Sequence, residues 1–302
     1  MASKALSSRT SRPLGASQFN ILGKRFEDFP VTALDPRAPW AFTCLDFGKT
    51  NCVNATAFAT LGWTVTDINT ATSPTLVADS GNGYLLVNPG TKADSGYGLQ
   101  ANVANVVSRD VMRFMATPNV TLNAGREIVW GIRMGLQNTS ASTWDSKWFV
   151  GLSLTDTALM TGGTGALDGV TDCIGFHCGE DGVIKLVAYE ATPGTESLTL
   201  TGYTPTTLGG GTISTTLAYD DFHDFVFYAK WNAAAGTTGT DIVEAYIDGK
   251  YIGRITGTTI LPDLTTISLY NTIEVLNGPA EDMDMGVVAI WNGTKRYAQS
   301  QI

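Results

Sequence analysis

The segments Asp220-Asp-Phe-His-Asp-Phe-Val-Phe-Tyr-Ala-Lys-Trp231 and Ile242-Val-Glu-Ala-Tyr-Ile-Asp-Gly-Lys-Tyr-Ile-Gly253 decide the fold of this chain. From Phe225 onward, large apolar side chains recur at alternate positions, which is the two-residue period of a β-strand. The second segment alternates in the same way until it reaches Asp248-Gly249, a dipeptide that accepts the positive φ angles of a tight turn. The two segments therefore predict a long strand that leads into a β-hairpin.

Strand-like alternation continues along the chain on both sides of this hairpin. Short apolar runs are separated by turn-forming clusters such as Asp79–Gly83. The segment Leu99–Met112 partly fits a helical face, but its four valines disfavour a helix, so we expect irregular structure there. Many short strands without alternating helices predict an all-β antiparallel sandwich rather than a parallel α/β sheet. The other expected strands are 42–46, 53–59, 62–68, 84–87, 113–116, 128–137, 147–155, 172–177, 183–190, 266–270, 273–276 and 283–291.

Length and composition are compatible with one large sandwich preceded by an arm. The chain has 302 residues, and only 16% of them are charged. A domain of this size can bury about three quarters of its unfolded surface, so its core needs no disulfide or metal. Residues 1–40 show no periodicity and contain four prolines, which resist helix formation. We therefore predict an extended basic N-terminal arm over 1–40 and a single β-sandwich over 41–302.

Charge is distributed unevenly between these two parts. The first 26 residues hold five basic and no acidic side chains, whereas the rest of the chain holds 14 basic and 28 acidic residues. An acidic body repels phosphate groups, so we exclude nucleic acid as a partner and expect the arm to bind protein. No run has the apolar core of a secretory signal or approaches the ~18 apolar residues of a membrane span. The five basic residues of the arm are Lys4, Arg9, Arg12, Lys24 and Arg25.

The four cysteines are Cys44, Cys52, Cys173 and Cys178, and their spacings fit no compact zinc signature. We expect buried, reduced thiols, because free cysteine packs as a small hydrophobe and the chain shows no export signal.

Several segments resemble, in the same order, the jelly-roll proteins of tailed-phage virions. The hairpin motif YIDGKYIG is itself similar to the back half of a concanavalin A-like or laminin-G-like jelly roll. The resemblance covers about residues 110–295 and leaves residues 1–40 without a counterpart. Its segments are NVTLNAGREIVWGIRM (Asn119–Met134), KWFVGLSLTDTALM (Lys147–Met160), DGVTDCIGFHCGEDGVIKLVAYE (Asp168–Glu190), the two segments quoted first, and EDMDMGVVAIWNG (Glu281–Gly293).

This resemblance implies a concanavalin A-like jelly roll with a structural, non-enzymatic role. We therefore expect a capsid decoration (cement-type) protein on the exterior of a virion that assembles in the host cytoplasm. The implied partners are the major capsid protein and sister copies in a homo-oligomer, with no membrane and no cofactor. Adhesion through many copies would multiply modest contacts into high avidity.

The alternative hypothesis is a carbohydrate-binding module for host adhesion on the capsid or tail, with a surface glycan as partner. Trp144 and Trp148 flank Asp145 and are candidates for stacking on sugar. Trp144 fits an interface contact equally well, since tryptophan is enriched at interfaces, and Trp148 fits the core. The residues therefore identify no sugar site.

A glycan hydrolase is the least favoured hypothesis. Glycosidases of this fold carry alternating carboxylates on one strand, so that two acids face one cleft. Asp282 and Asp284 alternate in this way but lack the Glu-x-Asp-x-Glu spacing, so we interpret them as solvated acids. His177 and His223 are the two histidines, and no Gly-x-Ser-x-Gly motif accompanies them. We interpret His223, which lies among acids that would raise its pKa, as structural, and we predict no catalytic residue.

A calcium site is the remaining candidate. Calcium takes clustered loop oxygens, and four acids lie near glycines in one stretch of the chain. Because no Asp-x-Asp-x-Asp-Gly loop is present, we favour solvated turn acids and predict no metal. The four acids are Asp168, Asp172, Glu180 and Asp181.

Overall fold

The protein is described from a computed structural model. Among the described residues, no helix has the length and hydropathy needed to cross a membrane. The described residues are 40–47, 63–68, 75–79, 84–88, 96–101, 126–138, 147–154, 159–160, 164–167, 172–190, 194–205, 208, 222–232, 239–258, 260–262, 269–277 and 283–295.

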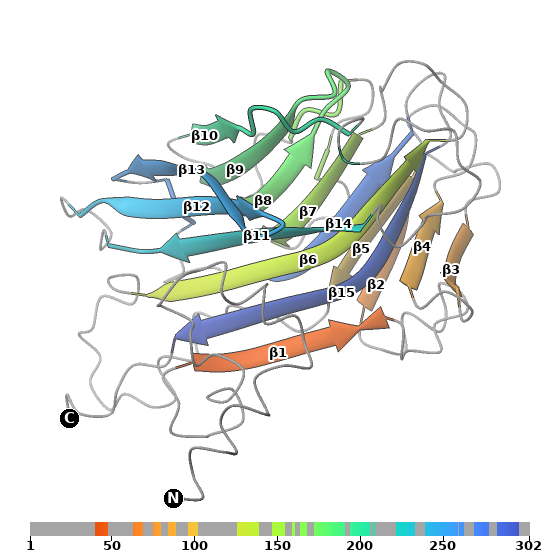
Figure 1. The fold of residues 1–302 in the computed structure, drawn as a ribbon, viewed down its shortest axis with the longest axis horizontal. Helices are drawn as coiled ribbons and strands as arrows, with labels where there is room; N and C mark the ends of the chain where they lie inside the picture. The colour runs from red at the N-terminus through yellow and green to blue at the C-terminus, as the bar shows by residue number, and fades with distance from the viewer. Residues whose placement is uncertain are drawn as a thin grey trace, which may run out of the picture.

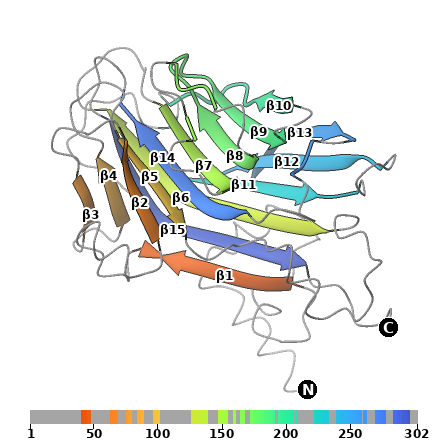
Figure 2. The same ribbon diagram turned by 180° about the vertical axis from the view of Figure 1, so that it is seen from behind.

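The described strands form two antiparallel sheets that pack against each other (Figure 1, Figure 2). The order in sheet A is β13-β12-β11-β6-β15-β4-β3, with β1 also pairing to β15; the order in sheet B is β10-β9-β8-β7-β14-β5-β2. Sheet A contains β1 (Trp40–Asp46), β3 (Thr75–Asp79), β4 (Tyr84–Asn88), β6 (Glu127–Asn138), β11 (Phe222–Lys230), β12 (Asp241–Ile247), β13 (Lys250–Gly257) and β15 (Met283–Lys295). Sheet B contains β2 (Trp63–Ile68), β5 (Gly96–Ala101), β7 (Lys147–Ser153), β8 (Cys173–Cys178), β9 (Ile184–Glu190), β10 (Gly194–Thr199) and β14 (Tyr270–Leu276).

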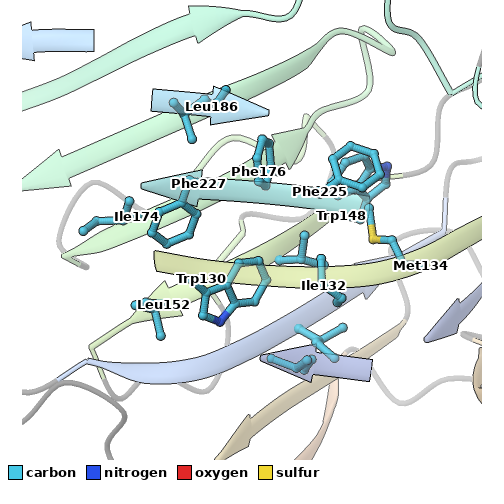
Figure 3. Close-up of a cluster of buried hydrophobic side chains, with 14 of the residues drawn as sticks. Trp130, Ile132, Met134, Trp148, Leu152, Ile174, Phe176, Leu186, Phe225 and Phe227 are labelled. Atoms are coloured by element: carbon cyan, nitrogen blue, oxygen red, sulfur yellow. The ribbon is translucent and has the colours of Figure 1, made fainter. Parts of the chain in front are cut away.

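The long strand expected from the sequence is β11, which lies between β6 and β12 in sheet A. Its alternating side chains Phe225 and Phe227 are buried between the two sheets (Figure 3). Phe176 of sheet B packs against both rings, at centroid distances of 5.3 and 6.3 Å. The expected hairpin is confirmed as well, because Asp248 and Gly249 form the turn between β12 and β13 with φ angles of 46° and 90°.

Two buried tryptophans lie in the same core but differ in the hydrogen bonding of their indole N–H groups. The Trp130 ring stacks on Phe227 at 5.4 Å, and its Nε1 donates a hydrogen bond of 2.7 Å to Oδ1 of Asn271. The Trp148 ring meets Phe225 edge-on at 6.0 Å, and its buried Nε1 has no hydrogen-bond partner among the described residues. Burying an amide or indole donor without a partner costs free energy, so only the first tryptophan gains from its polar atom.

The antiparallel sandwich is confirmed, with three departures in the strand assignments. The strands β3, β5 and β10 were not expected, and Leu99–Ala101 end β5 rather than begin an irregular segment. Glycine at Gly96 and Gly98 conceals the apolar alternation of β5. Tyr270, the last residue of the strand expected at 266–270, belongs to β14 together with the strand expected at 273–276, and β14 runs unbroken from Tyr270 to Leu276. Residues 266–268 lie outside the described residues. The strands expected at 53–59 and 113–116 lie outside the described residues.

Polar residues do not interrupt β14 because each has a partner. Asn271 binds Trp130, and the hydroxyls of Thr272 and Ser153 lie 2.7 Å apart. At the start of the sandwich, Trp40 already belongs to β1 and lies opposite Lys295 of β15. The segment preceding it lies outside the described residues.

Two of the four cysteines are buried, as expected, at the two ends of β8. Their odd separation puts them on opposite faces of the sheet: Cys178 lies in the main core and Cys173 in a cluster on the other side. A disulfide between them is therefore excluded in this fold. Burial, with a smaller contribution from Asp172, raises the pKa of the Cys173 thiol. The side chains of Cys44 and Cys52 lie outside the described residues.

Candidate functional site

The outer face of sheet B, which points away from sheet A, is covered at its centre by part of the connection between β7 and β8. We call the described pieces of this connection, residues 159–160 and 164–167, the strap. Its two pieces meet in an isolated β-bridge between Met160 and Leu167. The strap completes a hydrophobic cluster distinct from the main core, formed by Phe149, Leu159, Met160, Cys173, Val187, Tyr189 and Leu276, with Leu167 packed against it.

Glu274 of β14 holds the first piece of the strap in place. Its side chain is buried beneath the strap. The backbone N–H of Leu159 donates to Oε2 at 2.7 Å, and that of Met160 donates to Oε1 at 2.9 Å. Hydrogen bonds to an ionised acceptor are roughly twice as strong as neutral ones. Both carboxylate oxygens are thus engaged in a structural contact with the backbone.

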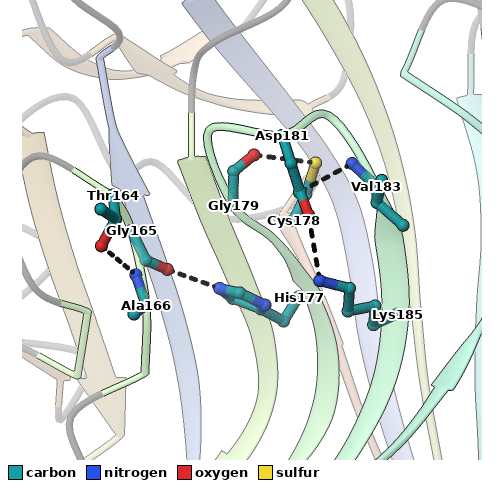
Figure 4. A network of polar contacts seen from close by, with 9 residues as sticks. All are labelled: Thr164, Gly165, Ala166, His177, Cys178, Gly179, Asp181, Val183 and Lys185. Carbon is teal, nitrogen blue, oxygen red and sulfur yellow. Dashed lines mark hydrogen bonds and ion pairs between the residues drawn. The ribbon is translucent and has the colours of Figure 1, made fainter.

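His177 of β8 holds the second piece (Figure 4). Its Nε2 lies 2.7 Å from the carbonyl oxygen of Gly165, which can only accept, so Nε2 carries the proton. Nearby, the N–H of Glu180 donates to the carbonyl of Thr164 at 3.2 Å. Burial lowers the pKa of His177 below its ordinary value of 6.5 and favours the neutral ring. This histidine is structural.

Gly165 is required at its position for two reasons. Its φ is +65°, a conformation that side chains with a Cβ rarely adopt. A Cβ there would also approach the aliphatic stem of Lys147 to 2.5–2.8 Å. Lys147 is fully buried on β7, so its stem cannot swing into solvent. The strap therefore lies directly on this lysine.

A second polar cluster lies where the tip of the β12–β13 hairpin meets β11. Nδ1 of His223 lies 2.6 Å from Oδ2 of Asp248, and Oδ1 of Asp248 accepts from the N–H of Asp224 at 2.9 Å. The N–H of Asp248 donates in return to the carbonyl of Asp224 at 2.9 Å. Arg133 of β6 pairs with Asp224 at 3.3 Å. The cluster fixes the hairpin tip to the centre of sheet A.

The expected rise in the pKa of His223 is confirmed in direction, but its main cause was not anticipated. The hydrogen bond to Asp248, which is 25 residues away, contributes most, and the adjacent Asp224 contributes less. The sequence pointed only to neighbouring acids.

The two histidines should respond to pH with opposite signs. The pKa of His223 is raised by Asp248, so its contribution to stability is present below its unfolded value of 6.5 and is lost as pH rises through the folded value. The pKa of His177 is lowered by burial, so its neutral contribution is present above 6.5 and is lost as pH falls. We expect His223→Gln to cost more stability at about pH 6 than at about pH 9, by less than about 1 kcal/mol because the pair is partly solvated. His177→Gln should show the reverse dependence. Urea unfolding of each variant at both pH values measures this, and parallel pH profiles for the two variants would contradict it.

The acids singled out in the sequence do not meet in one place among the described residues. The backbone of Asp284 lies in β15 of sheet A, opposite Gln137, while its side chain and all of Asp282 lie outside the described residues. Of the calcium candidates, Asp181 accepts from the N–H of Val183 at 3.0 Å and pairs with Lys185 at 3.1 Å. Within the described part of the chain, no three acidic, histidine or cysteine side chains form a group that could hold a metal ion.

The two tryptophans considered as sugar-stacking candidates have different outcomes. Trp148 belongs to the core, which confirms one of its two interpretations. Trp144, Asp168 and the five basic residues of the arm lie outside the described residues.

Sequence reasoning missed Glu274 and Lys147. The signal for Glu274 was its place between Ile273 and Val275, both fully buried, in an expected strand. A carboxylate in such a strand needs a specific partner, since buried charges are rarely tolerated without one. For Lys147, at the start of β7, the sequence carries no comparable signal.

Comparison with known structures identifies the fold. An endo-1,3-β-glucanase from Streptomyces sioyaensis superposes with a TM-score of 0.51 and 12% identity, over 87% of this chain and 99% of the other. This is a concanavalin A-like fold. An alginate lyase from a Chlorella virus (TM-score 0.48, 11% identity, 84% and 99% covered) and a legume lectin-like domain from Entamoeba histolytica (0.47, 10%, 82% and 95%) are also similar.

At such low identities the similarity concerns the fold alone, which lectins and glucanases share. No protein-family model matches the chain, and a search of curated proteins gives no match.

Proposed function

We propose that this protein is a non-enzymatic structural protein of a tailed-phage virion, which decorates the capsid exterior. The sandwich would lie on the capsid surface, and the basic arm would reach the major capsid protein or a sister copy. The phage assignment is supported by the ordered resemblance of six sequence segments to virion jelly rolls.

The proposal that the protein is not an enzyme rests on the hydrogen bonding of Glu274. A catalytic carboxylate must reach the substrate with at least one oxygen, as general acid, base or nucleophile. Both oxygens of Glu274 instead bind strap N–H groups. His177 is likewise committed to Gly165. These side chains support a role in which the outer face of sheet B is a closed structural surface.

The arm provides the direct test of the capsid role. Deleting residues 2–30 should leave a soluble protein with an unchanged β-sheet circular dichroism spectrum but reduce its occupancy on purified capsids. Raising the salt concentration should weaken attachment of the intact protein more than that of the truncated one, because exposed charge contacts are screened over a Debye length of about 8 Å at physiological ionic strength.

A charge-neutral arm, with glutamine in place of the five basic residues, is the matched control that keeps arm length constant. Equal capsid occupancy for the intact, truncated and neutral proteins would refute the tether. Binding on a glycan array without binding to capsids would favour the carbohydrate-binding alternative.

A further inference from the structure

The tip of the β12–β13 hairpin presents side chains that neither the core nor the strap uses. Among the described residues, Tyr251 is the large hydrophobic side chain that is exposed, at 49%. Lys250 and Arg254 on the same strand are exposed too. Neither cation forms an ion pair with any described residue. We call these three residues the hairpin patch.

A β-bulge brings two members of the patch onto one face. Tyr251 lies opposite Tyr246 and Arg254 lies opposite Glu244, with a register shift between Ala245 and Tyr246. In a regular strand, residues three apart point to opposite faces. The extra residue of the bulge instead aligns the tyrosine ring and the guanidinium on the outer face of sheet A, which is a common use of bulges.

Neighbouring side chains support Tyr251 and the hairpin tip in their positions. The ring of Tyr251 meets that of Tyr246 edge-on, with centroids 5.5 Å apart. The hydroxyl of Tyr246 donates to Oε2 of Glu244 at 2.8 Å. The hairpin tip itself is fixed to β11 through Asp248. A preorganised aromatic loses little conformational entropy on binding, so more of the contact energy is retained.

The patch itself contains two cations and no acid, although the chain as a whole carries a formal charge of −9. Of the acids near it, Asp248 pairs with His223 and Asp224 with Arg133, while Glu244 accepts a hydrogen bond from the uncharged hydroxyl of Tyr246. Lys250 and Arg254 form no ion pair with these acids, so both are available to a negatively charged partner.

The strand that carries the patch is the edge of sheet A. In the described topology β13 pairs with β12 alone, so its other side offers backbone N–H and C=O groups to an added strand. Two copies of β13 pairing with each other would bring like cations together, which is unfavourable. Nucleic acid would meet the acidic remainder of the chain.

We propose that the edge of β13 is a docking surface for an acidic, extended segment of another protein, which adds a strand to sheet A. Tyr251 would pack against its side chains, and Lys250 and Arg254 would pair with its carboxylates. Tyrosine and arginine are the residue types enriched at binding hot spots, and strand addition is a recurring mode of peptide recognition. The proposal uses no residue of the arm and no contact with a capsid, so it does not rest on the decoration role.

The test uses the full-length protein and a fluorescent peptide of 8 residues, the length of β13, with alternating glutamate and valine. We expect saturable binding by fluorescence anisotropy and new hydrogen-exchange protection of β13 amides. Tyr251→Ala and Arg254→Glu should each weaken binding about tenfold, as loss of a hot-spot residue does. Arg254→Glu should also gain affinity for the same peptide with lysine in place of glutamate.

Thr199→Ala, on the exposed edge strand β10, is the matched control and should bind as the wild type does. Absence of saturable binding would overturn the proposal, as would wild-type affinity in both the Tyr251→Ala and the Arg254→Glu variants. Binding of a single-stranded oligonucleotide at the patch, without the peptide, would assign the surface to nucleic acid instead. Because no capsid is present in this assay, its failure is distinguishable from failure of the decoration role.

Discussion

Replacing Glu274 with alanine should lower the free energy of unfolding by about 3–6 kcal/mol, because two buried bonds to a charged acceptor are lost at about 1.5–3 kcal/mol each. The N–H groups of Leu159 and Met160 would then be left beneath the strap without their carboxylate partner. Glu274→Gln keeps one acceptor oxygen but turns an NH₂ group toward the other N–H, so an intermediate loss is expected. Urea unfolding with a linear extrapolation measures both variants.

Glu244→Gln is the matched control for this experiment. Glu244 is a partly buried acid on β12 with a side-chain partner, Tyr246, rather than backbone donors. Its substitution should cost less than about 1 kcal/mol, as is usual away from buried networks. If Glu274→Ala were no more destabilised than Glu244→Gln, the carboxylate would not hold the strap.

The second large effect concerns the two core tryptophans. Trp130→Phe removes the donor to Asn271 and leaves a buried amide oxygen without its partner, whereas Trp148→Phe removes an indole N–H that has no partner in the described part of the chain. Both substitutions remove similar volume from fully buried sites. We therefore expect Trp130→Phe to be more destabilising than Trp148→Phe by about 1–3 kcal/mol, the cost of an unsatisfied buried polar group.

The same urea unfolding measurement tests this difference, and the double variant provides an additivity check. The two sites pack against Phe227 and Phe225, which both contact Phe176, so the double variant measures any coupling through this shared ring. Equal destabilisation by the two single variants would show that the hydrogen bond to Asn271 contributes nothing.

Local sequence predicted the elements whose signals are local. Alternation in β11 and the Asp248-Gly249 turn identified a strand and a hairpin, because side-chain period and turn conformation depend on adjacent residues. The strand β5 was not predicted, because its glycines supply no apolar alternation. Two strands were predicted in place of β14, because the polar residues Asn271 and Thr272 suit a buried strand only when each has a hydrogen-bond partner there.

The candidate sites were less predictable than the fold, because their contacts join residues that are far apart in the sequence. His223 and Asp248 are 25 residues apart, and Glu274 binds backbone 114 and 115 residues away. Such contacts depend on which strands become neighbours and in which register. In sheet B, moreover, both faces of β7 and β8 are buried, so burial alone does not indicate which side chains face the strap.

The sequence by itself determined an all-β antiparallel sandwich, a tight hairpin near its end and a cluster of basic residues within the first 26 positions. These depend on periodicity, turn chemistry and charge, which are properties of short stretches. Only the tertiary structure decided that β6 lies beside β15, that Glu274 and His177 hold a strap over sheet B, and that Tyr251 and Arg254 share a face. Each of these follows from long-range strand pairing, where a shift of one residue would turn every side chain to the opposite face.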